Sequence, residues 1–204
     1  LSVPTHAPRV EAPTVGWTGS VVTHVGDLDV MGGVLPGVLA ETGARFVSWG
    51  VGLTEQALGV KGRVRPWADL RGAYPRQVAD LDVGLVPLAD NRFDAAKSWL
   101  KGMEYAALGV PFIASPRAEY RALWQVLPDP VLADPPETWR SCMRLLLTKP
   151  EVRSEIAGLN REAMTSHTYE NHADRWADAW RQAADNRTRE KAASAARAAG
   201  RMVA

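Results

Sequence analysis

Short apolar runs that alternate with helix-like segments constrain the fold of this chain more than any other feature. Val83–Leu88 and Phe112–Ala114 are such runs, and each is typical of a strand that is buried on both faces. Strands of this kind belong to parallel sheets, in which helices carry the chain from one strand to the next. Further strands are predicted at residues 14–17, 45–49, 64–67 and 131–132, and helices at 28–43, 70–79, 118–126 and directly after the loop 89–94.

The pattern changes after Pro135, where the sequence predicts helices only, at residues 137–148, 151–165 and 169–184. We therefore predict an α/β protein with a Rossmann-like doubly wound parallel sheet, helices on both faces and a helical C-terminal segment. Trp176 and Trp180 are four residues apart and share a helix face, which we expect to pack against the body of the protein.

The expected division of the chain has three parts. Residues 1–12, with prolines at positions 4 and 8 and another at 13, suggest a stiff linker or domain-connecting segment, and thus a fragment of a longer protein. Residues 13–185 form the Rossmann-like domain. Residues 186–204 form a basic, Ala-rich tail, either a frayed helix or disordered, for which a weak contact with an anionic surface stays open.

Composition excludes several classes of function. The formal net charge of +1 argues against a general nucleic-acid binder. No run of about 20 apolar residues predicts a membrane span. The single cysteine, Cys142, excludes an internal disulfide framework and is weakly indicative of a reducing compartment, so a cytoplasmic protein is expected.

Two loops lie where open α/β sheets bind ligands, beyond the carboxyl ends of the strands. The first is Gly16–Ser20, in which Gly19 lets a backbone approach a phosphate while Thr18 and Ser20 offer hydroxyl groups. Taken alone this loop is a weak indication, since any tight turn uses glycine and serine. It is not a G-x-G-x-x-G fingerprint.

The second loop leads into a helix that carries Lys97, Ser98, Lys101 and Glu104. Lysines near a helix N-terminus are unfavourable unless an anion binds there, because that end already has a partial positive charge. Residues 97, 101 and 104 are expected to share one helix face, with Glu104 able to accept hydrogen bonds from a vicinal diol. The residues alone leave open a second interpretation, an exposed helix with a surface pair of Lys101 and Glu104.

The segment 97–115, KSWLKGMEYAALGVPFIAS, resembles the nucleotide-sugar-binding segment of GT-B glycosyltransferases of the group-1, or family-4, class. The pattern of that family is roughly K-S-x-x-K-x-x-E-Y-x-A-x-G-x-P-h-h-A-S, where h is an apolar residue. ADLDVGLVPL resembles a strand of the same family, and VGWTGS resembles the first strand and glycine loop of its C-terminal domain. The resemblance covers about residues 13 to 125.

The resemblance implies the C-terminal, donor-binding domain of an enzyme that transfers a sugar from a nucleotide diphosphate sugar to a hydroxyl acceptor. A missing N-terminal domain would hold the acceptor, so the chain alone is expected to be inactive. The implied contacts are Gly19 and Ser20 near the donor phosphates, Ser98 and Lys101 on the diphosphate beside Lys97, Glu104 on the ribose, and the segment of Arg65 and Trp67 on the base, with Trp67 able to stack on it. No cofactor and no metal ion is implied, and no catalytic residue is assigned.

The sequence departs from that family at two places. The glycine loop continues with Val21, Val22, Thr23 and His24, where many relatives carry an Arg and a Lys, and Ala96 stands at the first glutamate of the family's E-x7-E pattern. A non-catalytic GT-B-like binding or structural module therefore remains an alternative, and a sugar-nucleotide epimerase of the same architecture a second one. His24 lies near the edge of the expected cleft, where it is able to donate to a phosphate, and Asp27 or Asp29 is predicted to cap the helix over residues 28–43.

Overall fold

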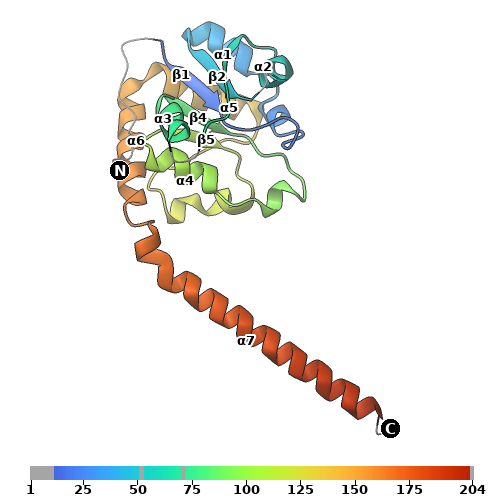
Figure 1. The fold of residues 1–204 in the computed structure, drawn as a ribbon. Helices are drawn as coiled ribbons and strands as arrows, with labels where there is room; N and C mark the ends of the chain where they lie inside the picture. The colour runs from blue at the N-terminus through green and yellow to red at the C-terminus, as the bar shows by residue number, and fades with distance from the viewer. Residues whose placement is uncertain (1–11, 51–52, 70–71, 203–204) are drawn as a thin grey trace. The chain divides into compact units, whose positions relative to one another are not determined.

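The computed structural model describes residues 12–50, 53–69 and 72–202 (Figure 1). The chain divides into two compact units, residues 1–165 and 166–204. The predicted linker, residues 1–12, lies outside the described residues except for its last position.

The first unit is built on a sheet of six parallel strands in the order β3-β2-β1-β4-β5-β6. The strands are β1 (Thr14–Trp17), β2 (Arg45–Trp49), β3 (Gly62–Arg65), β4 (Val83–Val86), β5 (Phe112–Ala114) and β6 (Val131–Leu132). The chain runs from β1 outward to β3, returns to β4 on the other side of β1, and then runs outward again to β6. This reversal beside β1 makes the sheet doubly wound, so the predicted fold class is confirmed.

Helices cover both faces of this sheet (Figure 1). They are η1 (Leu28–Met31), α1 (Leu35–Thr42), α2 (Leu53–Leu58), α3 (Ala73–Ala79), η2 (Asp94–Ala96), α4 (Leu100–Ala107), η3 (Ala118–Gln125), α5 (Pro136–Thr148) and α6 (Pro150–Met164), where η denotes a 3-10 helix. Neighbouring strand residues point to opposite faces. Phe46 thus packs in a core with Leu35 of α1 and Trp139 of α5, whereas Val47 packs in the other core with α3 and α4.

The structure differs from the sequence prediction in the first helix and in helix α2. The predicted helix over 28–43 is broken into η1 and α1, because Gly32 and Gly33 adopt left-handed φ angles of 56° and 71°. A helix cannot continue through that conformation, and Pro36 then stands in the first turn of α1. Helix α2 was not predicted, since residues 52–62 carry little apolar periodicity; only Thr54 and Leu58 of this short helix are buried.

The segment before α4 also corrects the sequence prediction. Lys97 has φ −76° and ψ 139°, which is extended backbone, and α4 begins only at Leu100. Lys97 therefore does not share a helix face with Lys101 and Glu104. The short helix η2 ends before it, and the Lys97 ammonium pairs with the buried Asp27 instead of lying along a helix.

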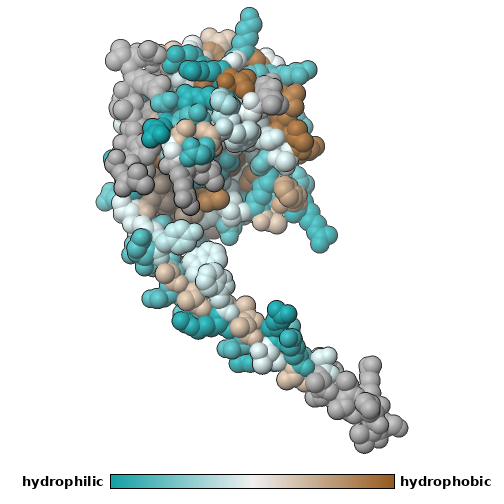
Figure 2. All heavy atoms as spheres, viewed as in Figure 1, coloured by the Kyte–Doolittle hydropathy of each residue, from teal (hydrophilic) through white to brown (hydrophobic). Residues whose placement is uncertain are grey.

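The second unit consists of helix α7 (Tyr169–Met202), which continues well beyond the predicted end at residue 184 and through most of the predicted tail. Trp176 and Trp180 are 56% and 68% exposed, and their ring centroids lie 6.2 Å apart. Their predicted packing against the first unit stays a prediction. In Figure 2 the strongly hydrophobic residues gather on the first unit, while α7 carries hydrophilic and pale residues. Within the described residues no helix combines the length and hydrophobicity needed to cross a membrane.

Candidate functional site

A pocket of about 440 Å³ opens at the carboxyl ends of β1 and β4, beside the start of α4. This is the edge where open α/β sheets bind ligands. Among its lining residues are Trp17, Thr18, His24, Trp67, Tyr74, Lys97, Ser98, Lys101, Glu104 and Tyr120.

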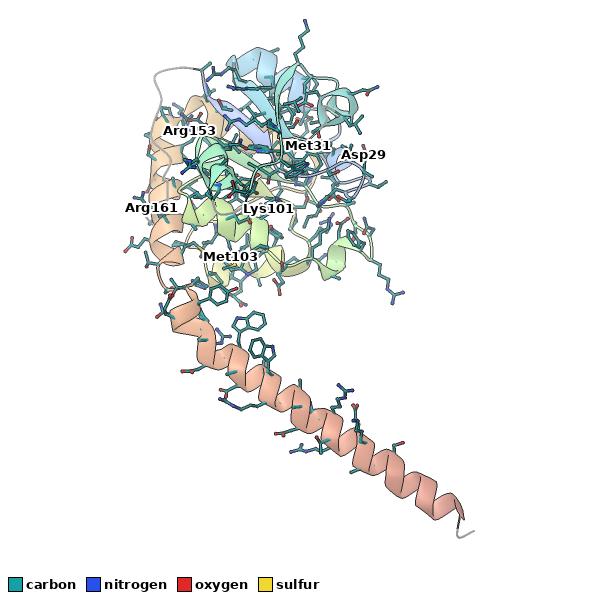
Figure 3. The ribbon with its side chains drawn as sticks, in the orientation of Figure 1. Asp29, Met31, Lys101, Met103, Arg153 and Arg161 are labelled. Atoms are coloured by element: carbon teal, nitrogen blue, oxygen red, sulfur yellow. The ribbon has the colours of Figure 1, made fainter. Side chains whose placement is uncertain are left out.

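Lys101 projects from the first turn of α4 into this pocket, and Figure 3 labels it on that helix. Its ammonium donates to the backbone carbonyl of Thr18 at 2.8 Å and to the Thr18 hydroxyl at 2.6 Å. Both acceptors are neutral, and no ion pair found among the described residues includes Lys101. Burial lowers the pKa of this ammonium, although the charge of Glu104 acts in the opposite direction. The pocket thus holds a desolvated cation without a paired anion.

Tyr105 and Gly84 explain how α4 comes to lie at the end of β1. Tyr105 is fully buried, and its hydroxyl lies 3.3 Å from the Thr18 hydroxyl. A Cβ at Gly84 of β4 would stand 2.7 Å from the Tyr105 ring, so only glycine leaves room for that ring on the strand. Lys101 precedes Tyr105 by one helical turn and therefore lies on the same face of α4. The packing of the Tyr105 ring thus places the Lys101 ammonium beside Thr18.

Glu104 follows one turn after Lys101 and accepts a hydrogen bond of 3.2 Å from the Tyr74 hydroxyl at its Oε2 atom. Burial raises the pKa of Tyr74 to about 12, and the neighbouring Glu104 charge adds to this effect, so Tyr74 stays a donor. None of the hydrogen bonds found among the described residues uses the other oxygen of Glu104, Oε1. That oxygen is able to accept from a ligand hydroxyl.

Lys97 lines the same pocket but is neutralised by a buried ion cluster. Its ammonium lies 3.1 Å from the Oδ2 atom of Asp27 and also contacts the carboxylate of Asp94. Asp27 is fully buried, and its Oδ1 atom accepts from the amide of Ala89 at 3.0 Å. Burial alone raises the pKa of Asp27, but hydrogen bonds from His24, Ala89 and Lys97 outweigh it and lower the pKa to about 2. The predicted role of Asp27 as a side-chain helix cap is wrong, since it makes no such bond.

The remaining predicted site residues divide into two groups. Ser98 and Trp67 line the pocket, and Trp67 is 55% exposed. Gly19, Ser20 and Arg65 are not among the lining residues. Arg65 donates to the carbonyl of Gln77 at 2.9 Å and pairs with Asp80 at 3.1 Å.

Gly19 has a packing role that the sequence did not indicate. A Cβ at this position would lie 2.1 Å from the indole ring of Trp17, which is itself 2% exposed. The glycine lets the loop after β1 pass directly over that ring. The Ser20 carbonyl accepts from the amides of Thr23 and His24, which closes the following turn.

Sequence reasoning missed Tyr74 as a pocket residue. In the sequence it belongs to a short predicted helix, where an aromatic residue is typical of the core, and nothing nearby connects it with Glu104, which follows 30 positions later. Thr18 was indicated only by its place in the glycine loop. Its contact with Lys101 spans 83 positions and has no local signature.

A second hollow, of about 520 Å³, lies at the amino ends of β2 and β3, where Lys61 and Arg63 line it. It is the larger of the two, but the amino ends of parallel strands are not where such sheets bind ligands. We therefore place the candidate site at the carboxyl edge. Among the residues that the structure describes, no group of three or more His, Cys, Asp or Glu side chains is arranged to hold a metal ion.

Comparison with known proteins shows which solved structures share this fold. No protein-family model matches the chain, and no curated protein matches it. Solved structures do match it in fold, at sequence identities that establish the fold alone. The O-GlcNAc transferase of Thermobaculum terrenum, crystallised as a mutant, matches with a TM-score of 0.66 and 17% identity over 88% of this chain and 37% of that one. HepE of Anabaena, crystallised in complex with UDP and glucose, matches with a TM-score of 0.60 and 14% identity over 83% of this chain and 48% of that one.

The chain therefore has the fold of one domain of the GT-B glycosyltransferases, as its resemblance to them predicted, and it spans less than half the length of these two enzymes. The C-terminal domain of a group 1 glycosyl transferase, LpcC of Francisella tularensis, matches with a TM-score of 0.55 and 13% identity over 80% of this chain and 87% of that structure.

Proposed function

We propose that this chain is the donor-binding domain of a glycosyltransferase, which transfers a sugar from a nucleotide diphosphate sugar to a hydroxyl acceptor. The observation that carries the proposal is the ammonium of Lys101, which is desolvated in a pocket and, among the described residues, donates only to the neutral oxygens of Thr18. A diphosphate in this pocket would supply the missing negative charge. As the sugar leaves, the same cation would stabilise the charge that develops on the diphosphate.

The pocket offers separate places for the parts of such a donor. In the proposal Lys101 and Ser98 meet the phosphates. The Oε1 atom of Glu104, which none of the hydrogen bonds among the described residues uses, accepts from a ribose hydroxyl one helical turn away. Trp67 is 55% exposed and lines the pocket, so its indole ring is a candidate for stacking on the base. The acceptor, the missing N-terminal domain and a cytoplasmic location belong to the proposal for the whole protein.

A non-catalytic nucleotide-binding module is the second candidate, and Ala96 favours it. Ala96 is exposed on η2, outside the residues that line the pocket, and its methyl group cannot make the hydrogen bonds that a glutamate makes to a sugar. The two candidates differ in what they bind. A donor domain gains affinity from the sugar, whereas a module that has kept only the nucleotide site does not.

Calorimetric titration of the 204-residue chain tests the proposal. UDP, GDP, UDP-glucose and GDP-mannose are titrated separately, first without chelator and then in EDTA. We expect at least one nucleotide diphosphate to bind, with the same affinity in EDTA, because a lysine rather than a metal ion meets the phosphates. Binding that disappears on chelation would contradict the metal-free site. Failure of every ligand to bind would contradict the proposed function itself.

A further inference from the structure

Helix α7 presents a surface that the proposed function does not use. It runs without a break over Tyr169–Met202, and at a rise of about 1.5 Å per residue its length is about 50 Å (Figure 1). None of the side chains that the structure describes in this helix, those of residues 169–194, is buried. Since helices in proteins are stabilised mainly by the packing of one face, a helix of this length is expected to have a partner.

One face of α7 carries aromatic side chains in its first half and cations in its second half. Trp176 and Trp180 are 56% and 68% exposed, and their ring centroids lie 6.2 Å apart. Arg187 follows Trp176 by eleven residues, and Lys191 follows Trp180 by the same number. Eleven residues make about three helical turns, so the four side chains share one face. Between the aromatic pair and the cationic pair this face carries the alanines at 183–184.

The two halves of α7 also differ in net charge. Residues 169–185 contain four acidic and two basic side chains, whereas residues 186–202 contain one acidic and five basic side chains. A partner that complements both halves is therefore basic beside the first half and acidic beside the second. A second copy of α7 has this distribution of charge when it lies antiparallel, whereas a parallel copy would place like charges together.

We propose that α7 pairs with α7 of a second copy of this chain in antiparallel orientation, and that the chain is a dimer. Trp176 of each copy packs against Lys191 of the other, and Trp180 packs against Arg187, so that every indole meets a cation. The alanines at 183–184 lie at the two-fold axis, where their small side chains let the helices approach each other. This inference goes beyond the proposed function and does not depend on it.

The same register brings a pair of opposite charges together beside the contact face. Arg175 directly precedes Trp176, and Glu190 directly precedes Lys191. In an antiparallel helix pair, the positions directly before the contact residues lie on the same side, so Arg175 faces Glu190 of the other copy. No ion pair found among the described residues includes either side chain. Both are therefore available for an ion pair between the copies.

Analytical ultracentrifugation of the 204-residue chain tests the proposal. We expect a dimer that dissociates on dilution and weakens as the salt concentration rises, because salt screens the opposite charges of the two halves. Arg187→Glu should raise the dissociation constant at least about tenfold, since it removes two cation–π contacts per dimer. Arg189→Glu is the matched control, with an expected change of less than about threefold. It changes the charge of the same half equally, but it lies on the opposite face of the helix.

Exchanging the flanking pair tests the register. Arg175→Glu and Glu190→Arg should each weaken the dimer about fivefold, because each places like charges opposite each other at two sites. The double variant should recover the affinity of the parent. An equimolar mixture of the two single variants should also recover it, since every facing pair in the mixed dimer is again of opposite charge.

Two kinds of result would overturn the proposal. The first is a chain that stays monomeric at low salt and at every concentration measured, which would favour the packing of the tryptophans against the first unit that the sequence predicts. The second is a dimer that responds equally to Arg187→Glu and Arg189→Glu, or that the charge exchange does not restore, because another surface would then join the copies. Circular dichroism shows whether each variant keeps α7 helical, and the measurement on the parent decides even where a variant does not.

Discussion

Replacing Lys101 tests whether the pocket is an anion site. In the structure its ammonium has two neutral acceptors on Thr18 and no carboxylate partner among the described residues, so a bound phosphate would be its first anionic contact. A hydrogen bond to a charged group contributes about 1.5–3 kcal/mol. Lys101→Ala is therefore expected to weaken diphosphate binding by about tenfold to a hundredfold.

Replacing Glu104 should separate the nucleoside from the phosphates. If the free Oε1 atom accepts from the ribose, Glu104→Ala weakens UDP and GDP but leaves inorganic pyrophosphate nearly unaffected, whereas Lys101→Ala weakens all three. Calorimetric titration of each variant with the three ligands measures this difference. Lys61→Ala is the control, because it removes an exposed lysine at the opposite edge of the sheet.

Stability measurements exclude a trivial cause for lost binding. Burial lowers the pKa of Lys101, so keeping this ammonium in the folded state costs free energy, and Lys101→Ala removes that cost. The variant also loses the two hydrogen bonds to Thr18, which lowers the free energy of unfolding. We expect either alanine variant to change the free energy of unfolding by no more than about 1 kcal/mol. The reasoning is refuted if both variants are folded and bind all three ligands as the parent does, since the helix would then be purely structural.

Four further outcomes are expected. Asp27→Asn should lower the free energy of unfolding by about 3 kcal/mol near neutral pH, because it removes a buried carboxylate that contacts His24, Lys97 and the amide of Ala89. Since folding lowers the pKa of Asp27 from 3.8 to about 2, this difference should shrink as the pH falls through that interval. Urea unfolding at pH values on either side of the interval would reveal a wrong sign. Gly19→Ala should lower the free energy of unfolding by about 1–3 kcal/mol, because the added methyl group displaces the Trp17 ring. Gly158→Ala in α6 should raise it by up to about 1 kcal/mol, because a Cβ there meets nothing within 4 Å. Thermal melts in which both variants have the melting temperature of the parent would contradict both expectations. The chain alone should form no glycosylated product from a sugar nucleotide and an acceptor, and turnover would disprove this.

The sheet could be predicted because each strand has a signature in a few consecutive residues. Val83–Val86 and Phe112–Ala114 are buried on both faces, and the absence of polar residues from these runs predicts that burial. Helix α2 escaped prediction for the opposite reason, since most of its side chains are at least partly exposed and its apolar period is weak. The break at Gly32 and Gly33 was legible in principle, because consecutive glycines before Pro36 favour a turn over a continuous helix.

The candidate site was predictable only in part because its decisive contacts are distant in sequence. The helical spacing placed Lys101 and Glu104 on one face correctly, and both line the pocket. The same spacing wrongly placed Lys97 on that helix face. It could not indicate that the Lys97 ammonium pairs with Asp27, which lies 70 positions earlier in the sequence. Tyr74 likewise contacts the site through a hydrogen bond to Glu104, and no local sequence pattern predicts this bond.

Lys97 and Lys101 show why charge in a sequence does not by itself define an anion site. The two lysines are four positions apart and line one pocket. Among the residues that the structure describes, Lys97 has two carboxylate partners, whereas Lys101 has the oxygens of Thr18 alone. A ligand anion gains most from the cation that lacks a partner, since a paired ammonium must first give up part of its existing attraction. In the proposed site we therefore expect the affinity for a diphosphate to depend mainly on Lys101, while Lys97 holds together the ion cluster with Asp27 and Asp94.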